Sequence, residues 1–289
     1  MKTGLRWLLS GGMFAAGISL VVSNCERRAP DAGAGNETPP QGGVCAANYP
    51  LAYFAGTLLA GAAPVIFDAP PDEDPAFWQP DDAALQRFQQ ASVILMNGAG
   101  YSKWADQASL PQARVVDTSA AFANALIEVK AGATHSHGPT GEHSHGGTAF
   151  TTWIDFDQAA KQLDATARAL LPLVPAEEQA AFEKRRDDLR EQLLALDQRA
   201  LEAGKKLAGT NLLGSHPVYQ YLARRYRLNI REMHFEPDIV PDGEALEELR
   251  QALKDHPAAI MLWEAPPAAE TVSLLKSMGI RSVVFDPCG

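Results

Sequence analysis

The chain has 289 residues, of which 46% are hydrophobic and 21% are charged, and its formal net charge at pH 7 is -10. This length is enough for one large domain or for two smaller α/β lobes, each with its own buried core. The acidic balance disfavours nucleic acid and anionic membrane surfaces as partners, because the net field of the protein repels phosphate groups.

The N-terminus has the pattern of an export signal. Two basic residues precede an apolar run over residues 7–22, which is short for a membrane-spanning helix of about 20 strongly apolar residues. We therefore predict a signal peptide over residues 1–25 and a periplasmic or cell-envelope location. Cys25 stands where the acylated cysteine of a lipoprotein would be, although Asn24 replaces the small residue that usually precedes it. Lipid anchoring and ordinary signal cleavage both stay open.

The segment that follows is rich in Pro, Gly and Ala, and we predict a flexible linker over residues 26–43. The chain has three cysteines. If Cys25 carries a lipid, Cys45 and Cys288 could pair as a disulfide in an oxidising compartment. Cys45 could equally be a small buried strand residue, and the sequence does not decide between the two.

Short β-branched runs then alternate with amphipathic segments, a pattern that indicates parallel βαβ units. In the predicted N-terminal lobe, residues 44–175, the strands are expected over 44–48, 65–68, 92–97 and 114–117. Helices are expected between them over 50–60, 81–90 and, as a short piece, 102–108. In the predicted C-terminal lobe, residues 208–289, strands over 211–215, 230–235, 259–264 and 282–286 alternate with helices over 217–226, 242–255 and 267–278.

A long helical segment separates these lobes. Residues 177–207 contain no Pro and repeat leucines at helical spacing, which predicts an interlobe helix over about 176–207, roughly 45 Å long. A shorter helix before it starts at Asp155, a plausible cap, and stops at Pro172. The fold class expected is α/β, with two Rossmann-like lobes, each holding a parallel sheet of about four strands, joined by a long backbone helix.

A Gly- and His-rich loop over residues 133–147 is the most distinctive local signal. It carries two His-x-His pairs, formed by His135 with His137 and by His143 with His145. Imidazole is a favoured ligand of Zn, Cu, Ni and Fe, so the loop predicts contact with a transition metal. Ordering such a loop costs conformational entropy, which weakens the affinity.

Several polar residues fall at the ends of predicted C-lobe strands, where ligands of parallel α/β sheets gather. His216 follows the first of these strands and Asp286 ends the last, so the pair forms a candidate half-site for a divalent ion. Glu264 ends a third strand, and His234 and Glu236 end another. The alternative is that they are ordinary cap and turn residues.

Taken together, these features resemble the metal-binding, zinc-uptake type of solute-binding protein that serves ABC transporters (cluster A-I). The resemblance covers about residues 44–289 and rests on five motifs in order: NYPLAYFA at 48–55, DPAFWQP at 74–80, GAGYSKW at 98–104, SHPVYQYLA at 215–223 and FDPCG at 285–289. A His-rich loop before the interlobe helices is also typical of zinc-type members.

The resemblance implies a zinc ion held between the lobes by three histidines and one aspartate. By position, His216 matches the third histidine and Asp286 the aspartate, whereas Ala76 and Thr151 stand where the first two histidines belong. Two protein ligands are fewer than the four that zinc usually takes. The missing donors could come from the loop histidines, from Asp74 or Glu73, or from Glu264; the hypothesis preferred here combines His216 and Asp286 with loop histidines.

The function expected is capture of Zn²⁺, or a similar divalent transition metal, by a monomeric binding protein that delivers it to an ABC permease in the inner membrane. One alternative is a degenerate member that buffers zinc through its loop or binds a non-metal solute. A remoter alternative is a metal-dependent hydrolase with a zinc-bound water at an open coordination position. No nucleophile elbow, P-loop or His-Glu-x-x-His motif is present, so an enzyme is not expected.

Overall fold

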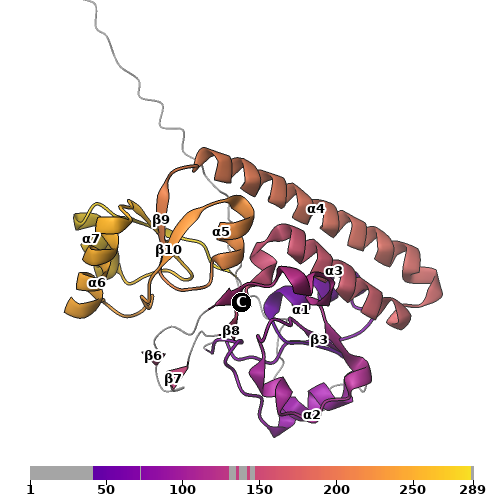
Figure 1. Ribbon diagram of the computed structural model, residues 1–289. Coiled ribbons are helices and arrows are strands. Elements are labelled where there is room, and N and C mark those ends of the chain that lie inside the picture. Colours follow the sequence, from indigo (N-terminus) through magenta and orange to yellow (C-terminus); the bar gives the residue numbers. More distant parts are fainter. Residues whose placement is uncertain (1–41, 72, 130–134, 137–141, 144–146, 288–289) are drawn as a thin grey trace, which may run out of the picture. The chain divides into compact units, whose positions relative to one another are not determined.

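The computed structural model describes residues 42–71, 73–129, 135–136, 142–143 and 147–287 (Figure 1). The predicted signal peptide, almost all of the predicted linker, His137, His145 and Cys288 lie outside these residues. None of the described helices is both long enough and apolar enough to cross a membrane.

The N-lobe is built on a four-stranded parallel sheet. Its strands are β1 (Val44–Ala46), β2 (Val65–Ile66), β3 (Val93–Met96) and β4 (Val115–Asp117), in the order β2-β1-β3-β4. Helices α1 (Tyr49–Leu59) and α2 (Asp82–Gln90) connect the first three strands, and short 3-10 helices cover Lys103–Asp106, Gln112–Arg114 and Ala120–Ala125. The expected alternation of strands and helices in this lobe is confirmed.

The C-lobe repeats this plan. Strands β9 (Asn211–Gly214), β10 (Asn229–Glu232), β11 (Ile260–Trp263) and β12 (Arg281–Val284) are parallel and lie in the order β10-β9-β11-β12. The connecting helices are α5 (Gln220–Tyr226), α6 (Gly243–Asp255) and α7 (Ala269–Ser277). Both sheets therefore reverse strand order between their first and third strands, which is where open α/β sheets bind ligands.

Two long helices lie between these sheets in sequence. Helix α3 (Phe156–Leu170) starts at Asp155, whose side chain accepts a hydrogen bond from Gln158 N at 3.2 Å, as expected for a cap. Short 3-10 turns flank it at Thr152–Ile154, Leu171–Leu173 and Ala176–Glu178. Helix α4 (Gln179–Lys206) has 28 residues and packs along α3 (Figure 1), which confirms the expected long interlobe helix.

Two short antiparallel pairings carry the described parts of the His-rich segment. Strand β5 (Glu128–Val129) pairs with β8 (Gly147–Thr148), and β6 (His135–Ser136) pairs with β7 (Glu142–His143). His135 and His143 are direct partners in the second pairing, so the backbone of His135–Ser136 runs antiparallel to that of Glu142–His143.

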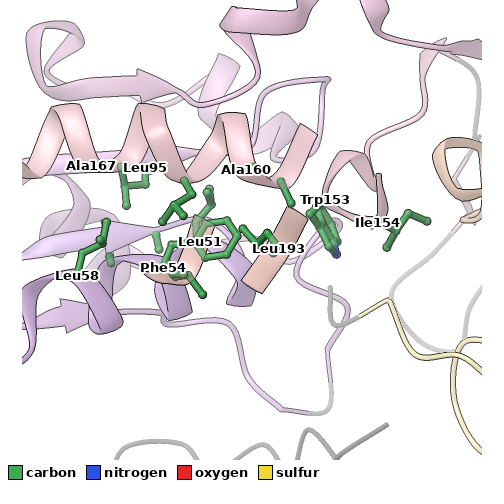
Figure 2. Close-up of a cluster of buried hydrophobic side chains, with 14 of the residues drawn as sticks. Leu51, Phe54, Leu58, Leu95, Trp153, Ile154, Ala160, Ala167 and Leu193 are labelled. Carbon is green, nitrogen blue, oxygen red and sulfur yellow. The ribbon is translucent and has the colours of Figure 1, made fainter. Parts of the chain in front are cut away.

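The largest hydrophobic core cluster lies where α1, α3 and α4 meet (Figure 2). Leu51, Phe54 and Leu58 of α1 recur at helical spacing and are almost fully buried against α3 residues such as Ala160 and α4 residues such as Leu193. The same cluster continues into C-lobe helix α5 through its buried aromatic and leucine side chains, Tyr221, Leu222 and Tyr226. Residues 218–226 therefore belong to a packed boundary between the lobes.

Hydrogen bonds from α5 tie the C-lobe to the N-lobe. The hydroxyl of Tyr221 accepts a hydrogen bond from Ile127 N at 3.2 Å and donates to Ala149 O at 2.9 Å. Arg224 donates to Ala125 O at 2.5 Å. Each of these bonds joins the C-lobe helix to backbone that lies between β4 and α3, the part of the N-lobe that also bears Thr151.

Candidate metal centre

Three side chains that could ligate a metal meet at the switch point of the C-lobe sheet. His216 comes two residues after β9, and Glu264 comes directly after β11, the neighbouring strand on the far side of the reversal. Glu236 follows β10, the strand on the other side of β9. These three residues are distant in sequence, and the order of the strands in the sheet brings them to the same edge.

The geometry of this cluster suits a small cation. His216 Nδ1 lies 3.3 Å from Glu264 Oε1, and His216 Nε2 lies 3.7 Å from Glu236 Oε1. One ligand atom from each of the three residues lies within 4.8 Å of the others. The imidazole is 3% exposed while both carboxylates are partly exposed, so the nitrogen donor is buried and the oxygens reach solvent.

The two-residue period of extended chain explains why these side chains share a face. Met233 and Phe235 belong to the hydrophobic cluster under α6 and α7, and so does Trp263. Glu236 and Glu264, one residue further on, therefore project to the opposite face, which is the face of His216. The ring of His234 stands edge-on to that of His216 at a centroid distance of 6.0 Å.

Asp286 is not one of the three clustered residues. Its position is nevertheless related to theirs through Tyr219, whose hydroxyl donates to Phe285 O at 2.9 Å. Burial raises the pKa of the Tyr219 phenol well above its usual range, and the negative charges of Glu264 and Asp286 raise it further. Both carboxylates thus act on the same buried hydroxyl, and the expectation that Asp286 is a ligand stays a prediction.

The two N-lobe carboxylates that the sequence offered as ligands, Glu73 and Asp74, do not belong to the group of three. Glu73 and Asp74 are both exposed, and Asp74 Oδ1 accepts a hydrogen bond from Ala76 N at 2.8 Å, which makes it a turn cap. Of the loop histidines, His135 and His143 are placed by their backbone pairing, whereas His137 and His145 fall outside the described residues. That any of these residues is a metal ligand stays a prediction.

The two positions where the family resemblance led us to expect histidines have other roles. Ala76 is 5% exposed and belongs to the largest hydrophobic cluster. Thr151 is 4% exposed, and its hydroxyl donates a hydrogen bond to Val218 O, across the lobe boundary, at 2.5 Å. Thr151 therefore serves as a contact between the lobes, and all three clustered donors come from the C-lobe.

The switch point of the N-lobe sheet holds a network of neutral polar groups. Asn48 and Asn97, which follow β1 and β3, are hydrogen-bonded at 3.3 Å, and Gln162 of α3 donates to Asn97 Oδ1 and to Thr118 Oγ1 at 3.0 Å each. Asn97 Nδ2 also donates to Phe150 O at 2.9 Å, which fixes the segment leading into Thr151. Buried amides that satisfy one another in this way stabilise a wall and supply no charged ligand.

A cavity of about 440 Å³ is lined in part by Phe150, whose carbonyl oxygen accepts the hydrogen bond from Asn97. Its lining comes from the N-lobe, including Ala76, Phe150 and Thr151, and from the start of the C-lobe helix region, namely Pro217 and Gln220. Pro217, which lines the cavity, directly follows His216, which belongs to the cluster, so adjacent residues of the chain contribute to both.

A family model described as the periplasmic component A of a zinc-uptake complex, ZnuA, matches residues 44–289. The zinc-binding lipoprotein AdcA of Streptococcus pneumoniae is 23% identical over 246 residues, which make up 83% of this chain and 48% of AdcA, so the chain spans about half of that relative's length. The high-affinity zinc uptake system protein ZnuA of Bacillus subtilis is 22% identical, with 82% of this chain and 76% of that protein covered.

The solved structure of the Zn(II)-bound ZnuA-like domain of S. pneumoniae AdcA superposes with a TM-score of 0.70 at 17% identity, covering 86% of this chain and 88% of that one. At this level of identity the likeness establishes the two-lobed α/β fold, as the sequence had predicted.

Proposed function

We propose that this chain, which belongs to the ZnuA family of periplasmic zinc-uptake components, is the solute-binding protein that captures Zn²⁺ outside the cytoplasm and passes it to a membrane permease. The names of its streptococcal and Bacillus relatives, a zinc-binding lipoprotein and a zinc-uptake protein, support the choice of zinc. The family is one of binding proteins, and we propose no catalytic activity.

The cluster of His216, Glu236 and Glu264 is the single observation that carries this proposal. One imidazole and two carboxylates within 4.8 Å of one another are donors that Zn²⁺ accepts, at a place in the fold where ligands bind. Burial of His216 keeps its nitrogen from solvent and directs it at the carboxylates. We propose these three residues as the protein ligands of the metal.

Three donors are one fewer than the usual tetrahedral set of zinc. We propose Asp286 as a further ligand, since it follows β12 at the same edge of the C-lobe sheet and directly follows Phe285, whose carbonyl oxygen accepts a hydrogen bond from the Tyr219 hydroxyl at 2.9 Å. The histidines of the loop over residues 133–147 are proposed as weaker, additional donors. A buffer that relies on this loop alone is the competing hypothesis.

The proposed route to the permease starts with export. We propose that residues 1–25 direct export, with Cys25 as the lipidation site if the chain is anchored, that residues 26–43 act as a tether, and that the protein works as a monomer. The family description as a periplasmic component supports this location.

A chelator-competition zinc titration of the full chain, with Glu264→Gln beside the control Glu248→Gln, tests the proposal. Glu248 is an exposed residue of α6, away from the cluster, so both changes remove one carboxylate charge but only one removes a proposed ligand. We expect Glu264→Gln, and likewise His216→Ala, to weaken zinc binding by at least about tenfold, while the control binds as the unmodified chain does.

Equal affinities in all these variants would refute the C-lobe site. If zinc binding then disappears on removal of residues 133–147, the competing loop hypothesis is the correct one.

A further inference from the structure

The cavity of about 440 Å³ has the size of a small-molecule site rather than that of a bare metal ion. Both positions where the family resemblance led us to expect histidines, Ala76 and Thr151, line it. Small residues continue the lining on either side, at Ala99, Gly100 and Ala149. The space that two imidazole side chains would take up is therefore left open in this chain.

Aromatic rings form one part of the lining. Phe150 meets Phe77 and Tyr101 edge to face, with ring centroids 6.2 and 5.3 Å apart. The centroid of the Tyr101 ring lies 5.7 Å from that of the buried Trp153. The three lining rings, Phe77, Tyr101 and Phe150, therefore pack on one another and on Trp153. Interlocked rings of this kind offer flat surfaces that suit an aromatic ligand group.

Charged and polar groups complete the lining. Lys103 and Asp106 are exposed residues of one 3-10 helix, and they offer opposite charges within three residues. Gln220 donates from Nε2 to Pro217 O at 2.8 Å and to Glu232 Oε2 at 3.2 Å, and these two acceptors fix which end of its amide is oxygen. Among the described residues, the buried Gln220 Oε1 then has no donor, and a ligand N–H would satisfy it.

The backbone beside this lining is held in an unusual conformation. Gly98, Ala99 and Gly100 all have positive φ, at 74°, 54° and 72°. Ala99 has a Cβ and is therefore strained, and a side chain at Gly98 would come within 2.1 Å of Asp117 Oδ1. Strain maintained in this way is characteristic of ligand sites.

We propose that the cavity binds a zwitterionic amino acid that carries an imidazole, and that the metal is taken up together with it. The imidazole occupies the space beside Ala76 and Thr151 against the aromatic rings, and its carboxylate faces Lys103. Its nitrogen supplies a donor that the cluster of His216, Glu236 and Glu264 lacks. This inference rests on the proposed metal-binding function, which it deepens by naming a second component of the substrate.

Equilibrium dialysis of the full chain against labelled L-histidine, with and without Zn²⁺, tests this inference. We expect one histidine to be retained per chain in the presence of zinc, and L-alanine not to compete. Lys103→Met is expected to weaken histidine retention at least tenfold and to leave zinc binding without histidine unchanged. Lys161→Met, which removes an exposed lysine of α3, is the matched control and should change neither quantity.

A double variant provides an independent check. Ala76→His with Thr151→His places imidazoles of the chain itself in the cavity, so it should bind zinc more tightly and retain no free histidine. Lys103→Met keeps the inference testable if the double variant does not fold.

Three outcomes would overturn the inference. No histidine is retained although zinc binds, in which case the proposed function stands alone. Histidine is retained equally by the chain and by Lys103→Met. Or zinc binding without free amino acid is lost when His135, His137, His143 and His145 are all changed to Ala, so that the chain's own loop fills the cavity. Histidine retained by a chain that binds no zinc would refute the proposed function and still support the cavity.

Discussion

Thr151 and Ala76 have structural roles at the two positions where the family resemblance implies metal-binding histidines. A buried threonine that donates to Val218 O and a buried alanine in the core leave the N-lobe without imidazole donors at these positions. The clustered donors, His216, Glu236 and Glu264, all follow strands of the C-lobe sheet. If these three residues are the protein ligands, as we propose, the donors that the chain itself supplies are positioned by one sheet.

Glu232 is the side chain whose titration is expected to affect stability near neutral pH. Burial raises its pKa to about 7, against an ordinary value of 4.5, although hydrogen bonds from Tyr219 N and Gln220 Nε2 act in the opposite direction. Between pH 4.5 and 7 the folded state then binds more protons than the unfolded state. This contribution to stability is present below the unfolded pKa and is lost as the pH rises through 7.

Glu232→Gln should remove that pH dependence, because an amide resembles the protonated acid in size and stays neutral. Between pH 5 and pH 8, the free energy of unfolding should fall in the unmodified chain by about 2 kcal/mol more than in the variant, once the partial exposure of Glu232 is allowed for. Urea unfolding at the two pH values in the presence of EDTA measures it, with Glu248→Gln as control. An identical pH dependence in the unmodified chain and in Glu232→Gln would contradict the assignment.

At the residue level, the sequence predicted part of the candidate site. His216, Glu236 and Glu264 could each be placed at the end of a strand, because hydrophobic strands followed by a polar residue are visible in the sequence. The sequence does not show that β10 and β11 both lie beside β9, so the three residues were not predicted to cluster and His216 was paired with Asp286 instead. The role of Thr151 was not predictable, because its partner is a backbone oxygen 67 positions away.

Helices α4 and α5 illustrate close packing at the scale of elements. Gly204 in the last turn of α4 is buried, and a Cβ at this position would lie 2.1 Å from Tyr226 O, at the end of α5. The absence of a side chain therefore sets the distance between the two helices. The sequence showed Gly204 only as an interruption in a long helix, while the helices themselves followed from apolar periodicity and caps.

Gly204→Ala should destabilise the protein by about 1–3 kcal/mol, because backbone must shift to admit the methyl group. Gly56→Ala is the matched control: Gly56 is an exposed glycine within α1 whose Cβ would meet nothing within 4 Å. The control should be neutral or stabilising by up to about 1 kcal/mol. Thermal unfolding of both variants measures the difference, and equal melting temperatures would refute the packing argument.

For the molecule as a whole, an ion pair with a buried carboxylate joins the interlobe helix α4 to the C-lobe helix α5, in addition to the contacts of Tyr221 with the N-lobe. Asp197 of α4 is 1% exposed and accepts two hydrogen bonds from Arg225, at 2.9 and 2.6 Å, and one from the Tyr226 hydroxyl at 3.1 Å. That hydroxyl also accepts from Phe156 N, at the start of α3. We therefore expect the described part of the chain to unfold as one cooperative unit.

Asp197→Ala should cost about 3–5 kcal/mol, because it leaves the Arg225 guanidinium without its bidentate partner beside a buried hydroxyl. Asp188→Ala breaks an exposed pair with Lys184 on the same helix and should cost at most about 0.5 kcal/mol. Urea unfolding followed by tryptophan fluorescence compares them. Similar losses of unfolding free energy in the two variants would mean that the hydrogen bonds of Asp197 do not hold α4 and α5 together.

Cys45 lies in β1, which is flanked by β2 and β3 in the N-lobe sheet, and it is fully buried. Burial raises the pKa of its thiol to about 12, so the folded chain presents neither access nor a thiolate at this position. In oxidising surroundings the thiol is therefore shielded once the sheet has formed, and is vulnerable only before that. Oxidation at Cys45 would therefore identify molecules that met an oxidant before they folded, and would show whether exposure to the oxidant came before or after folding.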